Sequence, residues 1–250
     1  MQKRLYIQIV ATSNQIAGYE VFIRYAAFVS NLFTFNLPVV TIKHTQKLLI
    51  EFSDSIITGF AFPEEKGQSI YTIQEKFTFA EFSNASPLEK KSMLTDSVYK
   101  SLLNLYEHIG LNSSDVELAY KQIITNHFIL SVQLCGGVKQ NKKGAIKASV
   151  TAEHFLDYAL IRVTFSNDKN TVIQVDLFKT VPVYYIYTQL VNSAKWINNN
   201  VFAISNNSKE FVLNIEPNGS YAIAYNPKLR STDGLKEEIK SLAKEILIDF

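Results

Sequence analysis

The second half of the chain consists of short segments in which apolar and polar residues alternate, with polar turns between them. Segments of this kind cover residues 128–134, 159–165, 173–177, 183–190, 201–205, 210–215 and 221–225. Alternation with period two places one set of side chains on one face of a β-strand. The turns INNN, SNNSK and EPNGS are typical of hairpin connections. We therefore expect an extensive antiparallel β-meander over residues 128–225.

In residues 85–127 the apolar residues recur at the spacing of an α-helix. Ser86-Pro87-Leu88-Glu89 forms a capping box with proline at the first helical position, and Gly110 is placed to end the helix. Ser114-Asp115-Val116-Glu117 repeats the box and predicts a second helix to about His127. Because the loop is short, the two helices should form an antiparallel hairpin. The first helix carries an apolar stripe of Leu94, Val98, Leu102, Leu105 and Ile109.

The two ends of the chain complete the predicted fold. Residues 1–84 are predicted to form a β-rich lobe, with strands at residues 5–10, 39–42, 48–52, 56–62 and 71–79. Residues 19–33 fit a helix or a strand, and one apolar helical face favours the helix. Near the other end, residues 231–247 predict a helix that covers the sheet. Its apolar face contains Leu235, Ile239, Leu242, Ile246 and Leu247.

These patterns predict an α+β protein with a β-rich lobe (1–84), a helical hairpin (85–127) and an antiparallel sheet with a C-terminal helix (128–250). The three parts could form a single domain. The order of elements is similar to the helix-grip architecture of START-like domains, although the helical hairpin is longer. This similarity implies a small-molecule cavity between the sheet and the C-terminal helix.

Composition excludes several classes of protein. The 250 residues are 47% hydrophobic, which is too apolar for a disordered chain, and the single cysteine cannot form an internal disulfide. With 25 basic and 23 acidic residues, bulk charge gives no reason to expect nucleic acid or membrane as partner. The apolar stretch over residues 21–40 is interrupted by polar residues, so we expect no membrane span. The reduced cysteine and the absence of a signal-peptide pattern predict a cytoplasmic protein.

Two groups of residues are candidates for catalysis. Cys135 precedes Gly136-Gly137 and could be a nucleophile at a strand end, with His127 or His154 as its base. The alternative is a small buried residue before a flexible turn. No phosphate-binding, dinucleotide-binding or metal-ligand motif occurs, so no cofactor and no metal are predicted.

The second catalytic candidate is an acid–histidine cluster. Glu153, His154 and Asp157 lie within five residues of sequence. On a helix the two acids would share a face, whereas on a strand His154 would point away from both. The alternative is a polar stretch at a bend before Tyr158.

Lysines and aromatic residues are the candidates for binding. The densest basic loop contains Lys139, Lys142 and Lys143, and it could meet an acidic partner or a phosphate or be an ordinary solvated hairpin end. Exposed Tyr and Trp on a rigid sheet are frequent anchors of protein interfaces, although they could also form a covered sheet face. The candidates of this type are Tyr184, Tyr185, Tyr187, Trp196, Tyr221 and Tyr225.

We therefore expect a non-enzymatic protein that binds a protein partner, for example a bacterial inhibitor or immunity-type protein. Two alternatives stay open: a small-molecule binder of helix-grip type, and an enzyme that uses Cys135 or the Glu153–His154–Asp157 cluster. The sequence makes no prediction of oligomeric state.

Overall fold

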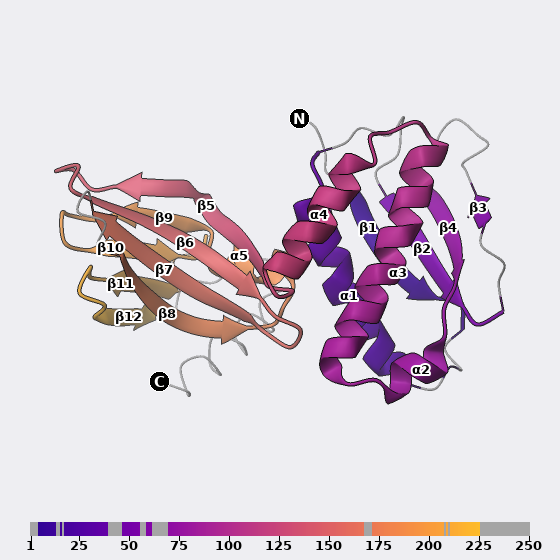
Figure 1. Cartoon of the computed structure of the whole chain (residues 1–250). Coiled ribbons are helices and arrows are strands. Elements are labelled where there is room, and N and C mark those ends of the chain that lie inside the picture. Colours follow the sequence, from indigo (N-terminus) through magenta and orange to yellow (C-terminus); the bar gives the residue numbers. More distant parts are fainter. Residues whose placement is uncertain are drawn as a thin grey trace. The chain divides into compact units, whose positions relative to one another are not determined.

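The computed structural model describes residues 5–13, 16, 18–39, 47–55, 59–61, 70–167, 172–207, 209 and 211–225 (Figure 1). Helices and antiparallel sheets occur together, which confirms the predicted α+β class. The chain divides into two compact units, Met1–Leu130 (unit 1) and Ser131–Phe250 (unit 2). The helices expected at residues 85–127 belong to unit 1, together with the N-terminal strands.

Unit 1 contains a four-stranded sheet in the order β1-β2-β4-β3. Strands β1 (Tyr6–Ala11), β2 (Lys47–Ser53) and β4 (Ile70–Lys76) are parallel, and β3 (Gly59–Ala61) pairs antiparallel with β4. Ile9, Ile50 and Ile73 lie side by side across the three parallel strands and are all buried. The alternation that predicts the first strand is confirmed, because this row forms one face of the core.

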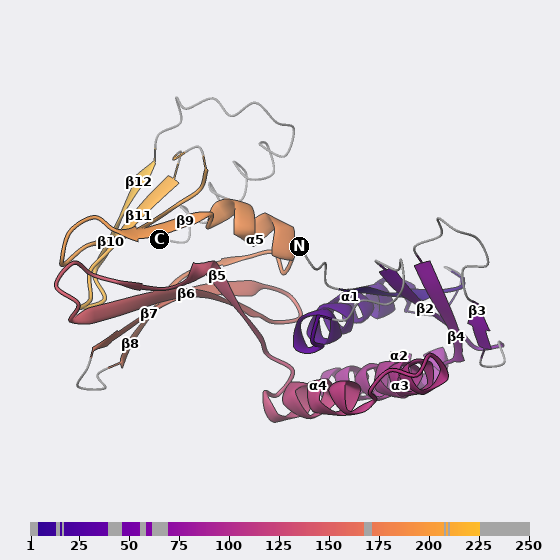
Figure 2. The same ribbon diagram turned by 90° about the horizontal axis from the view of Figure 1, so that it is seen from above.

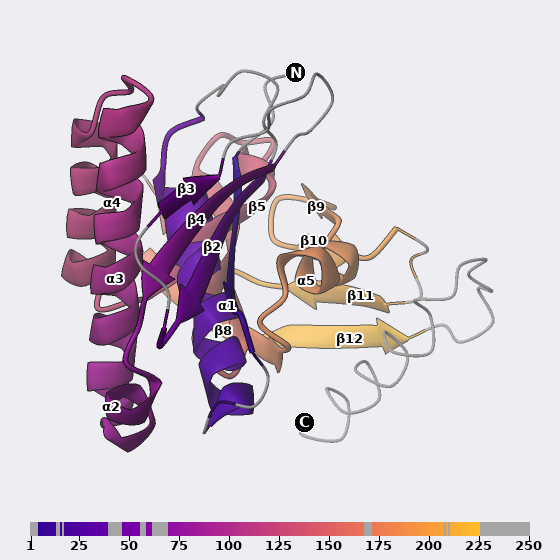
Figure 3. The same ribbon diagram turned by 90° about the vertical axis from the view of Figure 1, so that its right-hand side faces the viewer.

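Helix α1 (Tyr19–Asn36) connects the parallel strands β1 and β2 and packs against β1, as a crossover connection requires. The helical reading of residues 19–33 is therefore confirmed. Helix α1 also contacts α3 (Pro87–His108) and α4 (Ser114–Thr125), so helices cover the buried face of the sheet (Figures 2 and 3). Phe22 of α1 meets a cluster of rings formed by Phe52, Phe77, Phe79 and Phe82.

The expected helical hairpin is present, and its two helices begin differently. The Ser86 hydroxyl accepts a hydrogen bond from Glu89 N, and the Glu89 carboxylate accepts one from Ser86 N. Gly110 follows the end of α3 with φ 70°, a left-handed conformation that glycine adopts easily. The prediction of a second capping box at Ser114 is wrong. Helix α4 has Ser113 as its N-cap, and the Ser113 side chain makes no capping hydrogen bond. Instead, the Asn112 side chain accepts a hydrogen bond from Ser114 N.

The strand expected over residues 71–79 ends earlier than its alternation suggests. Strand β4 stops at Lys76, and Phe79 begins the short helix α2 (Phe79–Asn84). Asp54 accepts a hydrogen bond from Phe79 N. Phe77 and Phe79 both enter the same core cluster, so their spacing of two comes from ring packing around a turn and not from a strand.

Unit 2 contains two antiparallel sheets, each with its strands in chain order. The first comprises β5 (Leu130–Gln140), β6 (Ile146–His154), β7 (Ala159–Asn167) and β8 (Val172–Thr180). The second comprises β9 (Ser193–Trp196), β10 (Phe202–Ser205), β11 (Phe211–Ile215) and β12 (Tyr221–Tyr225). The expectation of one extensive meander is therefore wrong, because the chain passes from one sheet to the other after β8.

The two sheets face one another (Figure 2), and aromatic rings fill the space between them. Phe165 of β7 lies 5.8 Å from Trp196 of β9 and 6.0 Å from Phe202 of β10, measured between ring centroids. Trp196 and Phe202 also contact one another at 5.3 Å. Offset and edge contacts of this kind are favourable for buried rings, and they make this region a packed core.

Strand β5 is joined to the region of β9 by side chains that bond to backbone. The Trp196 indole N–H donates to Lys139 O at 3.0 Å, and Asn141 Nδ2 donates to Asn199 O at 3.1 Å. The Cys135 thiol donates to Val191 O at 3.4 Å. These three bonds connect the edges of the two sheets on one side of the sandwich.

The tyrosine-rich strand expected over residues 183–190 is absent, because Tyr184–Leu190 forms the helix α5. Tyrosine and isoleucine favour strands, but this preference depends strongly on context. Tyr187, Leu190 and Val191 are buried, and they follow one another at helical spacing. Burial of this helical face outweighs the weak strand preference of the segment.

Some sequence predictions fall outside the described residues. These are most of the strand expected at 39–42, the outer parts of the strand expected at 56–62, and the whole C-terminal helix expected at 231–247. The helix-grip arrangement depends on that last helix. Among the helices that the structure describes, none combines the length and apolar character needed to cross a membrane.

Candidate functional site

The basic loop lies at the tip of the β5–β6 hairpin and is held by one buried side chain. Asn141 is 6% exposed, and its Oδ1 accepts hydrogen bonds from Ala145 N and Ile146 N. Its Nδ2 donates a hydrogen bond to Asn199 O in the β9–β10 turn. The Asn141 side chain therefore closes the tip through its Oδ1 and joins the tip to that turn through its Nδ2. Lys142 and Lys143 stand exposed on this tip, whereas Lys139 is half-buried on β5.

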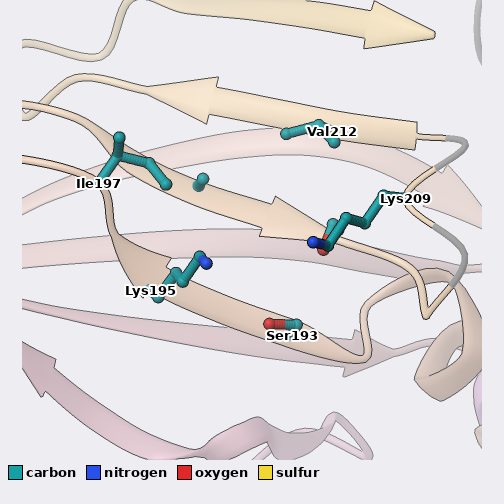
Figure 4. Close-up of a pocket in the computed structure, with 7 residues that line it drawn as sticks. Ser193, Lys195, Ile197, Lys209 and Val212 are labelled. Atoms are coloured by element: carbon teal, nitrogen blue, oxygen red, sulfur yellow. The ribbon is translucent and has the colours of Figure 1, made fainter. Parts of the chain in front are cut away.

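The second sheet of unit 2 has a shallow depression of about 190 Å³ on the face that points away from the first sheet (Figure 4). The strand register explains it. Ser193 of β9 pairs with Ser205 of β10, and Lys195 of β9 pairs with Ala203 of β10. Short side chains thus form the floor between longer ones. The lining residues are Ser193, Lys195, Ile197, Ala203, Ser205, Lys209 and Val212.

The six aromatic candidates come from three different elements of unit 2. Tyr184, Tyr185 and Tyr187 belong to α5, Trp196 to β9, and Tyr221 and Tyr225 to β12. Tyr184 and Tyr221 are exposed at 43% and 36%. Tyr187 is fully buried, so its ring is not exposed to a partner. Trp196 is half-buried, and its ring packs against Phe165 and Phe202. The structure describes the backbone of Tyr185 and Tyr225 but not their side chains.

Cys135 lies within β5 and not at a strand end. Cys135, Gly136 and Gly137 have φ values of 55°, 71° and 96°, so three consecutive left-handed residues bend the strand at its middle. Burial raises the pKa of the Cys135 thiol to about 11, although the Lys139 amine lowers it by a smaller amount. A thiol in this state is protonated at neutral pH and is a poor nucleophile.

The three side chains of the acid–histidine cluster do not come together in the structure. Glu153 and His154 end β6 and point to opposite faces, while Asp157 is exposed in the following turn. His154 is 1% exposed, and burial lowers its pKa to about 4. A hydrogen bond to the Pro182 carbonyl raises the pKa by less than burial lowers it. His154 is therefore neutral at physiological pH, inside the protein, and away from both acids.

Glu153 instead takes part in an ion network that the sequence does not reveal. On the outer face of the first sheet, Arg162 donates from Nη1 to Glu153 and from Nε to Asp176. These residues lie on β6, β7 and β8, and a register shift beside Arg162 aligns it with Asp176. The network is partly exposed and contributes to the pairing of these strands.

Among the described residues, no three His, Cys, Asp or Glu side chains lie close enough together to hold a metal ion. The sequence analysis also did not predict the depression near Lys195 and Lys209. The signal that could have revealed it is the alternation Ser193-Lys195 in one strand opposite Ala203-Ser205 in the next. Only the strand register shows that these residues share a face.

Comparison of the chain with known protein families, with curated proteins and with solved structures found no match.

Proposed function

We propose that the protein is a non-enzymatic binding protein that recognises a protein partner through the exposed tip of its β5–β6 hairpin. The supporting observation is the Asn141 network, which holds this tip in one conformation with Lys142 and Lys143 outside. A preordered tip loses little conformational entropy on binding, so two lysines on it can contribute usefully to affinity. Their charge favours an acidic surface on the partner.

The catalytic alternatives receive little support from the positions of their residues. The Cys135 thiol donates a hydrogen bond to the Val191 carbonyl, and its pKa is raised. Glu153 binds Arg162, whereas His154 is buried on the other face of β6. An acid–base mechanism would need such groups within hydrogen-bond reach of one another. The small-molecule alternative depends on a helix that lies outside the described residues.

The experiment compares partner capture by three tagged proteins in extracts of the source organism. They are the wild-type chain, Lys142→Ser/Lys143→Ser, and a control, Lys100→Gln/Lys121→Gln. The control removes the same charge from exposed positions on α3 and α4. We expect one protein to be recovered in stoichiometric amount by the wild type and the control, and to be depleted about 10-fold with the hairpin variant. Equal recovery by all three proteins, or no stoichiometric partner, would contradict the proposal.

The inhibitor or immunity-type role is a finer form of the same proposal. If it holds, adding the purified chain to the captured partner in a 1:1 ratio will suppress the partner's activity. The Lys142→Ser/Lys143→Ser variant should need a higher concentration for the same effect. A partner whose activity is unchanged at saturation would reject the inhibitor role and leave protein binding intact.

A further inference from the structure

We infer that the depression on the outer face of β9, β10 and β11 is a binding site for an acidic side chain of a peptide segment in the partner. This inference rests on the proposed function and adds a second, specific contact to it. The site is the depression lined by Ser193, Lys195, Ile197, Ala203, Ser205, Lys209 and Val212.

The charges of the depression favour an anion. Lys195 and Lys209 approach from opposite sides, with their amine nitrogens directed into the space between them (Figure 4). None of the seven lining residues is acidic. Within the part of the chain that the structure describes, neither amine belongs to an ion pair. A carboxylate placed between the two amines would therefore form charge-assisted hydrogen bonds that replace water.

The floor of the depression adds hydrogen-bond donors at a suitable position. Ser193 and Ser205 pair across β9 and β10, so both side chains project on the same face. A serine hydroxyl can donate to a carboxylate oxygen, and Ala203 beside the serines leaves room for the ligand. The volume of about 190 Å³ fits one side chain and its immediate neighbours better than a large cofactor.

The walls favour a peptide carboxylate over a free phosphate. Ile197 and Val212 present apolar surface next to the amines. The methylene groups of a glutamate or a neighbouring apolar residue can bury this surface, whereas a phosphate ion cannot. The cationic groups are lysines, and arginine is the residue whose planar fork matches phosphate in two hydrogen bonds. The expected ligand is thus an Asp or Glu side chain next to an apolar residue.

The test uses the 250-residue chain and a library of displayed random peptides of about 12 residues, a length sufficient to span a site of this size. The library is selected on the wild type and, separately, on Lys195→Thr/Lys209→Asn. Threonine suits the strand position, and asparagine tolerates the left-handed conformation of residue 209, where φ is 56°. The control is again Lys100→Gln/Lys121→Gln. A third variant, Ser193→Leu, fills the depression without changing its charge.

We expect peptides selected on the wild type to be enriched in an Asp or Glu next to an apolar residue. Their affinity should fall by about 10-fold or more for the double lysine variant and for Ser193→Leu, and stay unchanged for the control. Selection of peptides without acidic residues, or equal binding to all variants, would overturn the inference. Release of the peptides by inorganic phosphate as readily as by excess peptide would also overturn it, because the anion alone would then suffice.

The two proposals can fail separately. Loss of the captured partner with Lys142→Ser/Lys143→Ser but not with Lys195→Thr/Lys209→Asn would leave the hairpin as the contact and reject the depression. Acid-dependent peptide selection without any stoichiometric partner would support the depression and reject the proposed role of the hairpin. Circular dichroism and a cooperative unfolding transition show that each variant is folded before it is compared.

Discussion

The imidazole of His154 meets the ring of Tyr187 edge to face inside unit 2, with 6.1 Å between ring centroids and an angle of 87° between planes. The contact joins the end of β6 to α5, and both side chains are almost fully buried. A residue that was a catalytic candidate and one that was an interface candidate therefore pack against each other in the core. The buried imidazole leads us to expect that the stability of unit 2 depends on pH.

Acid should destabilise unit 2 through His154. Its pKa is about 4 in the folded protein and 6.5 in an unperturbed chain, so the unfolded state takes up the proton first as the pH falls. The stability present above pH 6.5 is therefore lost progressively between pH 6.5 and about 4. We expect wild-type protein to lose on the order of 2 kcal/mol from this group between neutral pH and pH 4.5. Urea unfolding at a series of pH values measures the loss.

The control for this prediction is His154→Leu, which keeps an apolar side chain at the buried position but cannot titrate. Its stability at neutral pH falls because the bond to Pro182 is lost. Its decrease between pH 6.5 and 4.5 should be smaller than that of the wild type by the amount due to histidine. If the free energy of unfolding falls with pH by the same amount in both proteins, His154 is not the group responsible for the loss of stability in acid.

Removing the Tyr187 hydroxyl should not destabilise the protein. In the described structure this hydroxyl is buried without a hydrogen-bond partner, as is that of Tyr106 on α3. We expect Tyr187→Phe and Tyr106→Phe to leave the free energy of unfolding unchanged or to raise it by about 1 kcal/mol. The matched control is Tyr120→Phe, because the Tyr120 hydroxyl donates to Asp96 at 2.7 Å. That variant should lose about 1 kcal/mol in denaturant unfolding. A loss for Tyr187→Phe as large as for Tyr120→Phe would contradict this account.

The Cys135 thiol should react slowly in the folded protein. Its pKa of about 11, against 9.0 for an unperturbed thiol, lowers the thiolate fraction at neutral pH by about 100-fold. Alkylation by iodoacetamide, followed by mass spectrometry, should therefore be much faster in urea than in native buffer. Because the folded pKa is raised, this group's contribution to stability is lost as the pH rises above 9. Rapid alkylation of native protein at pH 7 would show that the thiol is activated, and would revive the nucleophile hypothesis.

The two serines before α3 and α4 should differ in their contribution to stability. Ser86 forms both bonds of a capping box, whereas Ser113 makes no side-chain capping bond. Ser86→Ala should lower the free energy of unfolding by about 1 kcal/mol, and Ser113→Ala by a few tenths at most. Thermal or denaturant unfolding of the two variants measures the difference. Equal losses would show that the capping bonds of Ser86 contribute nothing specific.

Local patterns predicted the elements whose stability depends on nearby residues. The capping box at Ser86 and the stripe that follows it define α3, because a cap and a helical face lie within one segment of chain. The alternation in β7 similarly defines a strand with one buried face. Residues 184–190 were mispredicted because a segment rich in Tyr, Ile and Thr forms a helix that buries Tyr187 and Leu190 in the core.

The candidate site was predictable only in part. The exposed lysines of the β5–β6 tip could be found in the sequence because turns rich in polar residues stay in solvent. The depression could not, because Lys195 of β9 and Lys209 of the β10–β11 connection line one site only when these strands lie side by side in the sheet. Glu153 and His154 are adjacent in sequence, yet the pleat of β6 sends them to opposite faces.

The sequence by itself determined the α+β class, the capped helical hairpin and most of the strands, because hydrophobic period and caps act over a few residues. Tertiary structure alone decided that β1, β2 and β4 pair in parallel and that the later strands divide into two sheets. It also decided which polar residues are buried and which meet at the depression. These properties arise from contacts between segments far apart in the chain, and period and composition contain no information about which segments will pair.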